Sequence, residues 1–90
     1  MFYVYVLYSE AFDKTYAGFT GSLEGRLAAH NHPSNKGYTK RFQPWKILHS
    51  ETYHSKKEAM ERERFLKSGA GRELIQRILN AEMKVEKFKM

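Results

Sequence analysis

Cysteine is absent from this sequence of 90 residues. Its absence excludes disulfide bonds and zinc sites built on thiolates, and it fits a reducing cytosol, so we expect a cytoplasmic protein. The apolar run at residues 2–8 is too short to span a membrane. No basic residue precedes that run and no small-residue cleavage site follows it, so we expect no signal peptide. The sequence also lacks internal repeats, low-complexity tracts and linkers, which indicates one small domain.

Positive charge, by contrast, is abundant. Lys and Arg number 16 against 10 Asp and Glu, which gives a net charge of +6. This excess indicates an anionic partner, of which nucleic acid is the commonest kind and an acidic membrane surface the second. We predict nucleic acid, most of all DNA, and no membrane; a protein that is merely basic is the alternative. An apolar fraction of 41%, with 14% aromatic residues, predicts a globular core.

The N-terminal part of the chain predicts a β-hairpin. Residues 2–8 combine β-branched and aromatic side chains, as a buried central strand does, and a polar break separates them from a second short run at residues 15–20. With the turn centred between positions 10 and 11, Tyr5 would lie directly opposite Tyr16, and both phenols would share one face. Gly18 would leave a gap in the sheet where another group or a ligand can approach.

The next segment predicts a helix with a polar edge. Ser22 has the residue type of a helix N-cap, and the helix would end at residue 30 or 31. Leu23 and Leu27 define its apolar stripe. His30 falls inside that stripe and Arg26 at its edge, and because they are four residues apart they present one surface.

A loop at residues 31–43 mixes basic and aromatic side chains. It carries Lys36, Lys40 and Arg41, with Tyr38 and Phe42 among them. This composition suits a phosphate backbone and unstacked bases, so we name Lys36, Tyr38, Lys40 and Arg41 as candidate nucleic-acid contacts. A solvated loop with two anchoring aromatics explains the segment equally well.

Residues 45–53 predict a third strand. Strict alternation would place five side chains on one face: Trp45, Ile47, His49, Glu51 and Tyr53. Neither face is cleanly apolar, so we expect an edge strand.

A capping box begins the second helix, from Ser55 to Glu58. Gly69 and Gly71 are expected to stop that helix, and a third helix follows from about residue 72. Its apolar side would carry Leu74, Ile75 and Ile78.

Helical geometry makes Glu63 the most informative residue of the second half. Ala59, Met60 and Leu66 form the predicted buried side, and Glu63 falls between them at about 100° per residue. An unpaired carboxylate there costs several kcal/mol unless a cation, a metal or hydrogen bonds compensate it. Glu61 projects away from that stripe.

Taken singly, these polar residues have ordinary explanations. Tyrosines in strands are usually packing residues, and a His at a helix end usually interacts with the helix dipole. Arg26 and Glu63 could form a structural salt bridge. The joint pattern points to a functional site, because polar groups aimed at core positions tend to mark such sites.

In these residues the chain resembles the GIY-YIG nucleases over residues 2–77. Residues 3–5 stand where that family has Gly-Ile-Tyr, and residues 16–18 where it has Tyr-Ile-Gly. The eleven-residue spacing from Tyr5 to Tyr16 and the ten-residue step to Arg26, with His30 one turn later, also match. Residues 61–65 look like the helix bearing the family's metal-binding glutamate, which would be Glu63.

Among the family, the chain looks most like the small, stand-alone, URI-type bacterial members. Two motif positions depart from the pattern, because Tyr3 replaces the first Gly and Ala17 the middle Ile. Many members carry an Asn about a dozen residues past the metal glutamate, where this chain has Ile75. Asn80 lies farther on, and no role is assigned to it.

The resemblance implies metal-dependent hydrolysis of phosphodiester bonds in DNA, single-stranded or branched, in repair or recombination. Glu63 would hold Mg²⁺ or Mn²⁺, Arg26 would pair with the scissile phosphate, and Tyr5 would position or deprotonate the attacking water. The surrounding hydrogen-bond network would include Tyr16, His30 and Tyr38. A phenol with a pKa near about 10 is a poor base at neutral pH, so Tyr5 needs a nearby cation or a relay through His30.

We therefore expect an α+β domain over residues 1–82, with a three-stranded antiparallel β-sheet flanked by helices in the order ββαβαα. Residues 83–90 would form a basic tail that frays. No haem or nucleotide cofactor is expected. The alternatives to a nuclease are a catalytically weak nucleic-acid-binding module of the same fold and a small interaction protein with a structural polar pocket. Substrate preference, metal choice and oligomeric state stay open.

Overall fold

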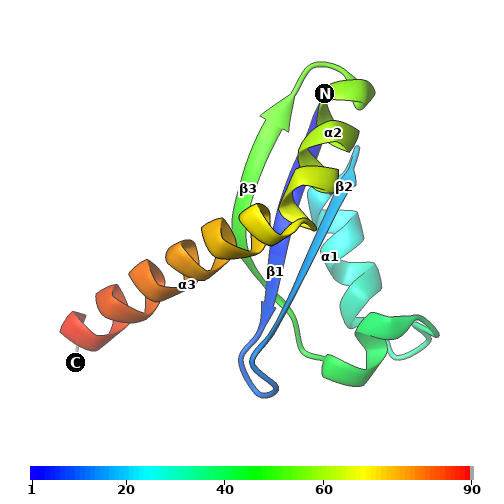
Figure 1. Cartoon of the computed structure of the whole chain (residues 1–90). Coiled ribbons are helices and arrows are strands. Elements are labelled where there is room, and N and C mark those ends of the chain that lie inside the picture. The colour runs from blue at the N-terminus through cyan, green and yellow to red at the C-terminus, as the bar shows by residue number, and fades with distance from the viewer. Residues whose placement is uncertain (90) are drawn as a thin grey trace.

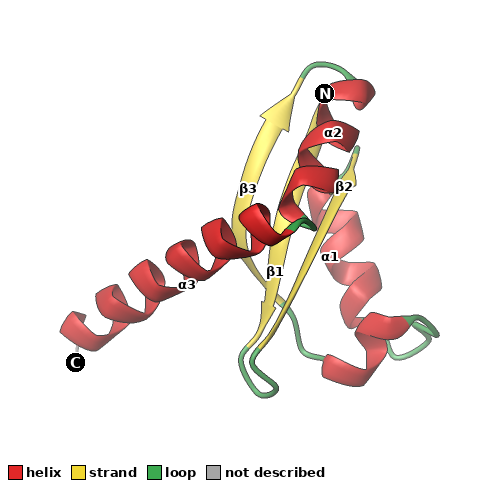
Figure 2. Cartoon of the chain, in the orientation of Figure 1, coloured by secondary structure: helices red, strands yellow, loops and turns green. Residues whose placement is uncertain are grey.

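A three-stranded antiparallel sheet in the order β2-β1-β3 forms the centre of the computed structural model (Figure 1). The structure describes the backbone of residues 1–89 and the side chains of residues 1–82. The strands are β1 (Phe2–Ser9), β2 (Lys14–Thr20) and β3 (Lys46–Tyr53). The helices are α1 (Leu23–Asn31), the short 3₁₀ helix η1 (Tyr38–Phe42), α2 (Lys56–Leu66) and α3 (Gly69–Lys89). The predicted fold class and the order ββαβαα are confirmed (Figure 2).

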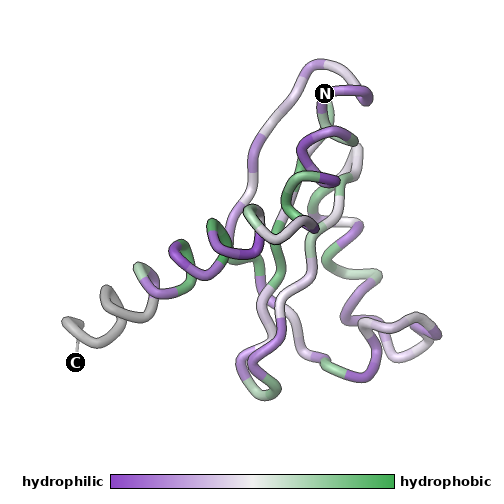
Figure 3. Tube along the Cα trace, viewed as in Figure 1, coloured by the Kyte–Doolittle hydropathy of each residue, from purple (hydrophilic) through white to green (hydrophobic). Residues whose placement is uncertain are grey.

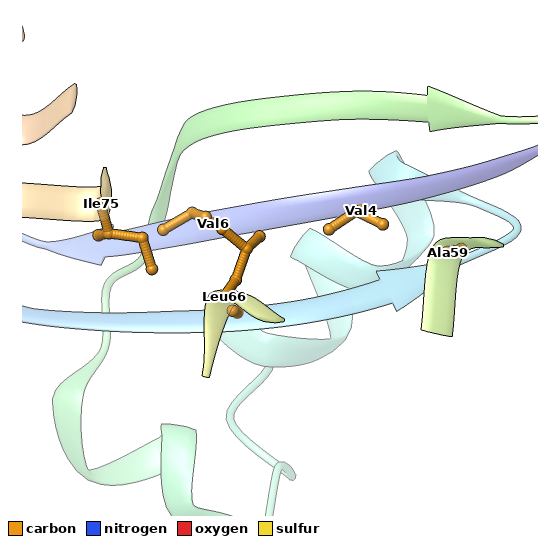
Figure 4. Packing of buried hydrophobic residues seen from close by; sticks show 6 residues of the cluster. Val4, Val6, Ala59, Leu66 and Ile75 are labelled. Atoms are coloured by element: carbon orange, nitrogen blue, oxygen red, sulfur yellow. The ribbon is translucent and has the colours of Figure 1, made fainter. Parts of the chain in front are cut away.

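Strand β1 is central and buried on both faces, as its apolar sequence predicts. Val4 and Val6 point to one face, where they pack against three buried residues of the helices, Ala59, Leu66 and Ile75 (Figure 4). Tyr5 and Leu7 point to the other face and pack with Trp45 and the α1 leucines. Helices α2 and α1 therefore cover opposite faces of the sheet (Figure 1).

The hairpin register differs from the predicted one. Tyr5 lies opposite Gly18, and Tyr16 lies opposite Leu7. Ser9 pairs with Lys14, so four residues form the turn, and its centre moves one position along the chain. This moves the register by two residues, which preserves the alternation of faces, and the two phenols still share one face.

Strand β3 is an edge strand, as predicted, but its faces do not alternate strictly. A bulge shifts its pairing with β1, because Val6 pairs with His49 while Leu7 pairs with Ile47. Trp45 consequently packs on the α1 face, whereas Tyr53 packs on the α2 face. The prediction that Trp45, Ile47, His49, Glu51 and Tyr53 share one face is wrong for this reason.

The second helix begins at the predicted cap and ends before the predicted glycines. Ser55 Oγ accepts a hydrogen bond from the backbone N–H of Glu58 at 3.2 Å. Gly69 and Gly71 lie in the first turn of α3 instead of ending α2. A Cβ at Gly71 would lie 2.1 Å from the Phe65 carbonyl oxygen, so a glycine is required where the two helices meet at a tight corner.

Two further expectations concern helix surfaces. Ala59 and Leu66 of α2 are buried, but Met60 is 42% exposed, so its predicted burial is wrong. The backbone of the expected tail continues α3 as far as Lys89, and its side chains lie outside the described part of the chain, so the fraying stays a prediction. Over the part that is described, no helix has both the length and the apolarity needed to cross a bilayer.

Candidate active site at the β2 edge

The phenol of Tyr5, on β1, lies over Gly18 of the neighbouring edge strand β2. Tyr5 is 2% exposed, and a Cβ built on Gly18 would lie 2.4 Å from its Oη. The gap predicted at Gly18 is thus filled by a group of the same chain. Any side chain at position 18 would force the phenol to move, so glycine is needed for the observed orientation of Tyr5.

Helix α1 brings His30 to the Tyr5 phenol. The helix begins at Ser22, whose Oγ accepts from the backbone N–H of Gly25 at 3.3 Å. Eight positions later His30 is buried, with Nε2 3.1 Å from Tyr5 Oη and Nδ1 2.8 Å from Thr39 Oγ1. The Tyr16 ring packs edge-on to the imidazole, with 5.1 Å between the ring centres. His30 therefore uses both ring nitrogens inside the site, which a partner of the helix dipole does not need to do.

Burial keeps both of these groups neutral at physiological pH. Burial raises the pKa of Tyr5, the Arg26 guanidinium opposes this, and the charges of Tyr16 and Glu63 add to the increase. Burial also lowers the pKa of His30, and the nearby Arg26 charge lowers it further. The pair at the site is consequently a protonated phenol and an uncharged imidazole.

Arg26 lies on the exposed side of this pair. It lines an open hollow of about 570 Å³ together with Tyr16, His30 and Tyr38. Within the described residues, no carboxylate lies within ion-pair distance of Arg26, so the structural salt bridge to Glu63 that the sequence allowed is not formed. The guanidinium is therefore available to an anionic ligand in the hollow.

Glu63 approaches the same edge from α2, on the opposite face of the sheet from α1. Its side chain is 24% exposed, and its Oε2 lies 3.9 Å from Lys67 Nζ. Lys67 Nζ in turn lies 5.5 Å from the centre of the Tyr16 ring. The carboxylate is thus partly buried near the tyrosines, and among the described side chains it has one loose ion pair.

A divalent cation would have to be held largely by Glu63. Among the described side chains, no group of at least three His, Asp or Glu residues gathers as a metal site. Mg²⁺ commonly keeps several waters and takes one or two protein carboxylates together with substrate phosphates. A single carboxylate that is partly open to solvent and close enough to Tyr5 to influence its charge fits that pattern.

The four nucleic-acid contacts predicted in the loop have different surroundings. Tyr38 lines the hollow, whereas Lys36 is exposed and does not line it. Lys40 donates a hydrogen bond to the carbonyl of Pro33. Arg41 lies over the Phe42 ring, with Cζ 5.9 Å from its centre. Of the four, Tyr38 alone lines the hollow together with Arg26.

Thr39 is a site residue that sequence reasoning missed. It is buried, its hydroxyl contacts His30, and it accepts from Asn35 Nδ2 at 2.8 Å. Its carbonyl accepts from Trp45 Nε1 at 2.7 Å, which ties η1 to the core. A 3₁₀ helix this short has no hydrophobic periodicity that could predict the burial of Thr39. The sequence offered one signal, an uncharged polar residue beside basic ones.

The closing helix supplies no amide to the site. Ile75 is buried in the core, and Asn80 is exposed and accepts from Gln76 Nε2 at 3.0 Å.

Known proteins resemble the chain over most of its length. Residues 1–76 match the GIY-YIG catalytic domain. UPF0213 protein CPE1444 of Clostridium perfringens is 33% identical over 88 residues, which cover 98% of this chain and 94% of that protein. UPF0213 protein NP_0776A of Natronomonas pharaonis is 41% identical over 66 residues, covering 73% of this chain and 76% of that protein.

A solved structure shows the same fold. The solution NMR structure of the UPF0213 protein BH0048 from Bacillus halodurans aligns with a TM-score of 0.51 and 27% identity, over 87% of this chain and 85% of that one. The family match implies, at the family level, a nuclease domain that hydrolyses phosphodiester bonds in nucleic acid. The chain belongs to the GIY-YIG catalytic-domain family.

Proposed function

We propose that this protein is a divalent-metal-dependent endonuclease that cuts DNA in repair or recombination. The observation that carries the proposal is the gathering of Tyr5, Tyr16, Arg26, His30 and Glu63 at the β2 edge, from two strands, two helices and both faces of the sheet. A catalytically weak binding module of the same fold is the second candidate. The carboxylate favours the enzyme, because a protein that only binds phosphates gains nothing from an anion among its contacts.

Arg26 is assigned to the scissile phosphate. Its guanidinium faces the hollow without an ion pair among the described residues, and its planar fork can bind two phosphate oxygens at once. Hydrolysis passes through a transition state in which negative charge on those oxygens is redistributed, and a fixed cation stabilises that charge. This assignment predicts a larger loss in rate than in affinity when the fork is removed.

Tyr5 and His30 are assigned to the movement of a proton. Because burial raises its pKa, the phenol is protonated at neutral pH and cannot by itself take a proton from water. When His30 donates its Nδ1–H to Thr39 Oγ1, its Nε2 is free to accept the phenol proton across 3.1 Å. The phenol can then take up a proton from the attacking water while it gives its own to the imidazole.

Glu63 is assigned to the metal, Mg²⁺ or Mn²⁺. When bound, the cation would act as a Lewis acid that stabilises the leaving oxygen. The protein's part is to supply one partly exposed carboxylate beside the phenols, with Lys67 close enough to limit its freedom. Binding of the rest of the strand is assigned to Tyr38, which lines the hollow, and to Lys36, Lys40 and Arg41 outside it.

A cleavage assay tests this function. Single-stranded, duplex and flapped DNA would be incubated with the protein in Mg²⁺, in Mn²⁺ and in a chelator. The proposal expects cleavage that requires the metal, and affinity that falls steeply from low to physiological salt. Tight, salt-dependent binding without cleavage in either metal would favour the binding module. A flat salt response would remove nucleic acid as the partner.

A further inference from the structure

The β1–β2 turn and η1 lie at the same end of the molecule (Figure 1), and aromatic side chains from the two form a platform. It consists of Phe12, from the turn, with Tyr38 and Phe42, from η1. The Phe42 ring centre is 5.5 Å from that of Phe12 and 5.1 Å from that of Tyr38. Phe42 is half-buried and packs on the core, so it holds the two outer rings in place.

The two outer rings face solvent. Phe12 is 49% exposed and Tyr38 is 55% exposed. In Figure 3 the tip of the turn carries hydrophobic colour between hydrophilic flanks. Exposed aromatic rings that each pack on one half-buried ring contribute little to the fold through burial, and such surfaces commonly mark a binding site.

Cations flank the platform. Lys14 Nζ lies 5.7 Å and Arg41 Cζ 5.9 Å from the centre of the Phe42 ring, from two different elements. Aromatic faces beside positive charges match a nucleic-acid single strand, whose bases stack while its phosphates pair with cations. A duplex cannot use the rings in this way, since its bases are already stacked on one another.

The platform is continuous with the candidate active site. Tyr38 belongs to both, because it also lines the hollow that holds Arg26 and His30. Inside the molecule, Phe42 packs against Trp45 at 6.5 Å and Trp45 against Tyr16 at 6.4 Å between ring centres. A strand whose phosphate lies at Arg26 therefore has the platform beside it.

We infer that Phe12 and Tyr38 stack unpaired bases of a single strand next to the bond to be cut. This inference rests on the proposed function and narrows its substrate to DNA with unpaired bases on one side of the scissile phosphate. Phe12, in the hairpin turn, becomes a residue that selects single-stranded over duplex DNA. The rings would otherwise serve only to hold the loop against the hairpin.

Binding without metal tests the inference, because it does not depend on cleavage. The probes are a fluorescein-labelled oligothymidylate and an abasic strand with the same number of phosphates, both followed by anisotropy in a chelator. The wild-type protein is expected to prefer the strand with bases. Phe12→Ala and Tyr38→Ala should each weaken binding of that strand by about tenfold and change binding of the abasic strand by less than about twofold.

Phe65→Ala provides a matched control. Phe65 is 39% exposed on α2 and has its own cation over the ring, with Arg62 Cζ at 5.1 Å, but it is not part of the platform. The control should leave both affinities unchanged. Equal weakening of both strands by the platform variants, or no preference in the wild-type protein, would overturn the inference.

A variant that gains a fluorescence signal tests the inference even when an alanine variant folds poorly. Phe12→Trp retains an aromatic ring and adds an exposed indole to a chain whose one Trp is 3% exposed. Oligothymidylate should quench the new fluorescence by stacking, and the abasic strand should not. Quenching by both strands alike would contradict stacking. Quenching together with an inactive protein would refute the nuclease and leave the platform standing.

Discussion

Glu51 on β3 and Glu63 on α2 have very different surroundings. Glu51, on β3, accepts from Arg62 Nε at 2.8 Å and Arg62 Nη2 at 3.0 Å, and from the Tyr53 hydroxyl at 2.7 Å. The His49 ring lies 2.8 Å from it. Hydrogen bonds from Arg62, followed by those of His49 and Tyr53, outweigh burial and lower the pKa of Glu51 to about 2. Glu63, by comparison, forms one ion pair within the described part of the chain, to Lys67 at 3.9 Å.

The two carboxylates differ because Arg62 and Glu63 project from different sides of α2. Arg62 and Glu63 are neighbours in sequence, so their side chains leave the helix about 100° apart. Arg62 points to β3 and forms an ion pair with Glu51, whereas Glu63 points to the β2 edge and remains open to a ligand. A satisfied carboxylate stabilises the fold, and an unsatisfied one is retained where a ligand can use it.

The largest expected effect concerns Arg26. Arg26→Lys retains the charge and loses the two-pronged contact, so cleavage should fall by about a hundredfold or more while affinity and melting temperature change little. Single-turnover cleavage and anisotropy measure the two quantities. Arg72→Lys, at an exposed position of α3, is the matched control. Parallel losses in binding and cleavage would make Arg26 a general anchor.

Replacing Glu51 should affect stability instead of catalysis. Glu51→Gln leaves Arg62 with a weaker partner and should lower the free energy of unfolding by about 1–3 kcal/mol. Urea unfolding at neutral pH measures this loss. Cleavage per folded molecule should stay at the wild-type level. A loss of cleavage without a loss of stability would reverse the roles of the two carboxylates.

The same carboxylate should govern acid stability. Since the folded pKa of Glu51 is about 2 against an ordinary 4.5, its contribution is fully present above pH 4.5 and is lost as the pH falls toward about 2. The partly exposed pair should contribute about 1–2 kcal/mol over this range, after screening by solvent. Unfolding of the wild-type protein and Glu51→Gln at decreasing pH compares them. Identical pH profiles would contradict the shift.

The smallest effect is expected at Lys67. Its contact with Glu63 is long, and its side chain is 50% exposed. Lys67→Met should therefore change the free energy of unfolding by no more than about 0.5 kcal/mol. A loss of several kcal/mol in urea unfolding would mean that Glu63 belongs to a structural ion pair after all.

The hairpin register was predicted wrongly, yet the sequence did predict which candidate site residues lie near one another. Periodicity singled out Arg26, His30 and Glu63, and the alternation of strand residues put both phenols on one face. That last prediction survived because the register moved by an even number of positions. The turn itself was not predictable from glycine, because Asp13 takes the positive φ of 51° and accepts a hydrogen bond from the Tyr8 hydroxyl.

Features that depend on tertiary contacts could not be predicted. The β3 bulge, the burial of Thr39 and the Glu51–Arg62 pair each involve groups far apart in the sequence. Gly69 and Gly71 predicted the end of α2, and α2 does end nearby. Gly71, however, is needed because α2 and α3 meet there at a tight corner. The aromatic platform likewise unites a turn and a loop that sequence alone keeps apart.

The most direct test compares Glu63→Gln with Glu51→Gln and with Glu61→Gln, an exposed control on the same helix. Each protein would be melted with and without Mg²⁺ and assayed for cleavage of the same DNA. The account predicts that Glu63→Gln melts at or slightly above the wild-type temperature without metal and does not cut. Glu51→Gln should melt lower and cut normally, and Glu61→Gln should match the wild type. A Glu63→Gln protein that melts much lower yet still cuts DNA would contradict the assignment of this carboxylate to catalysis.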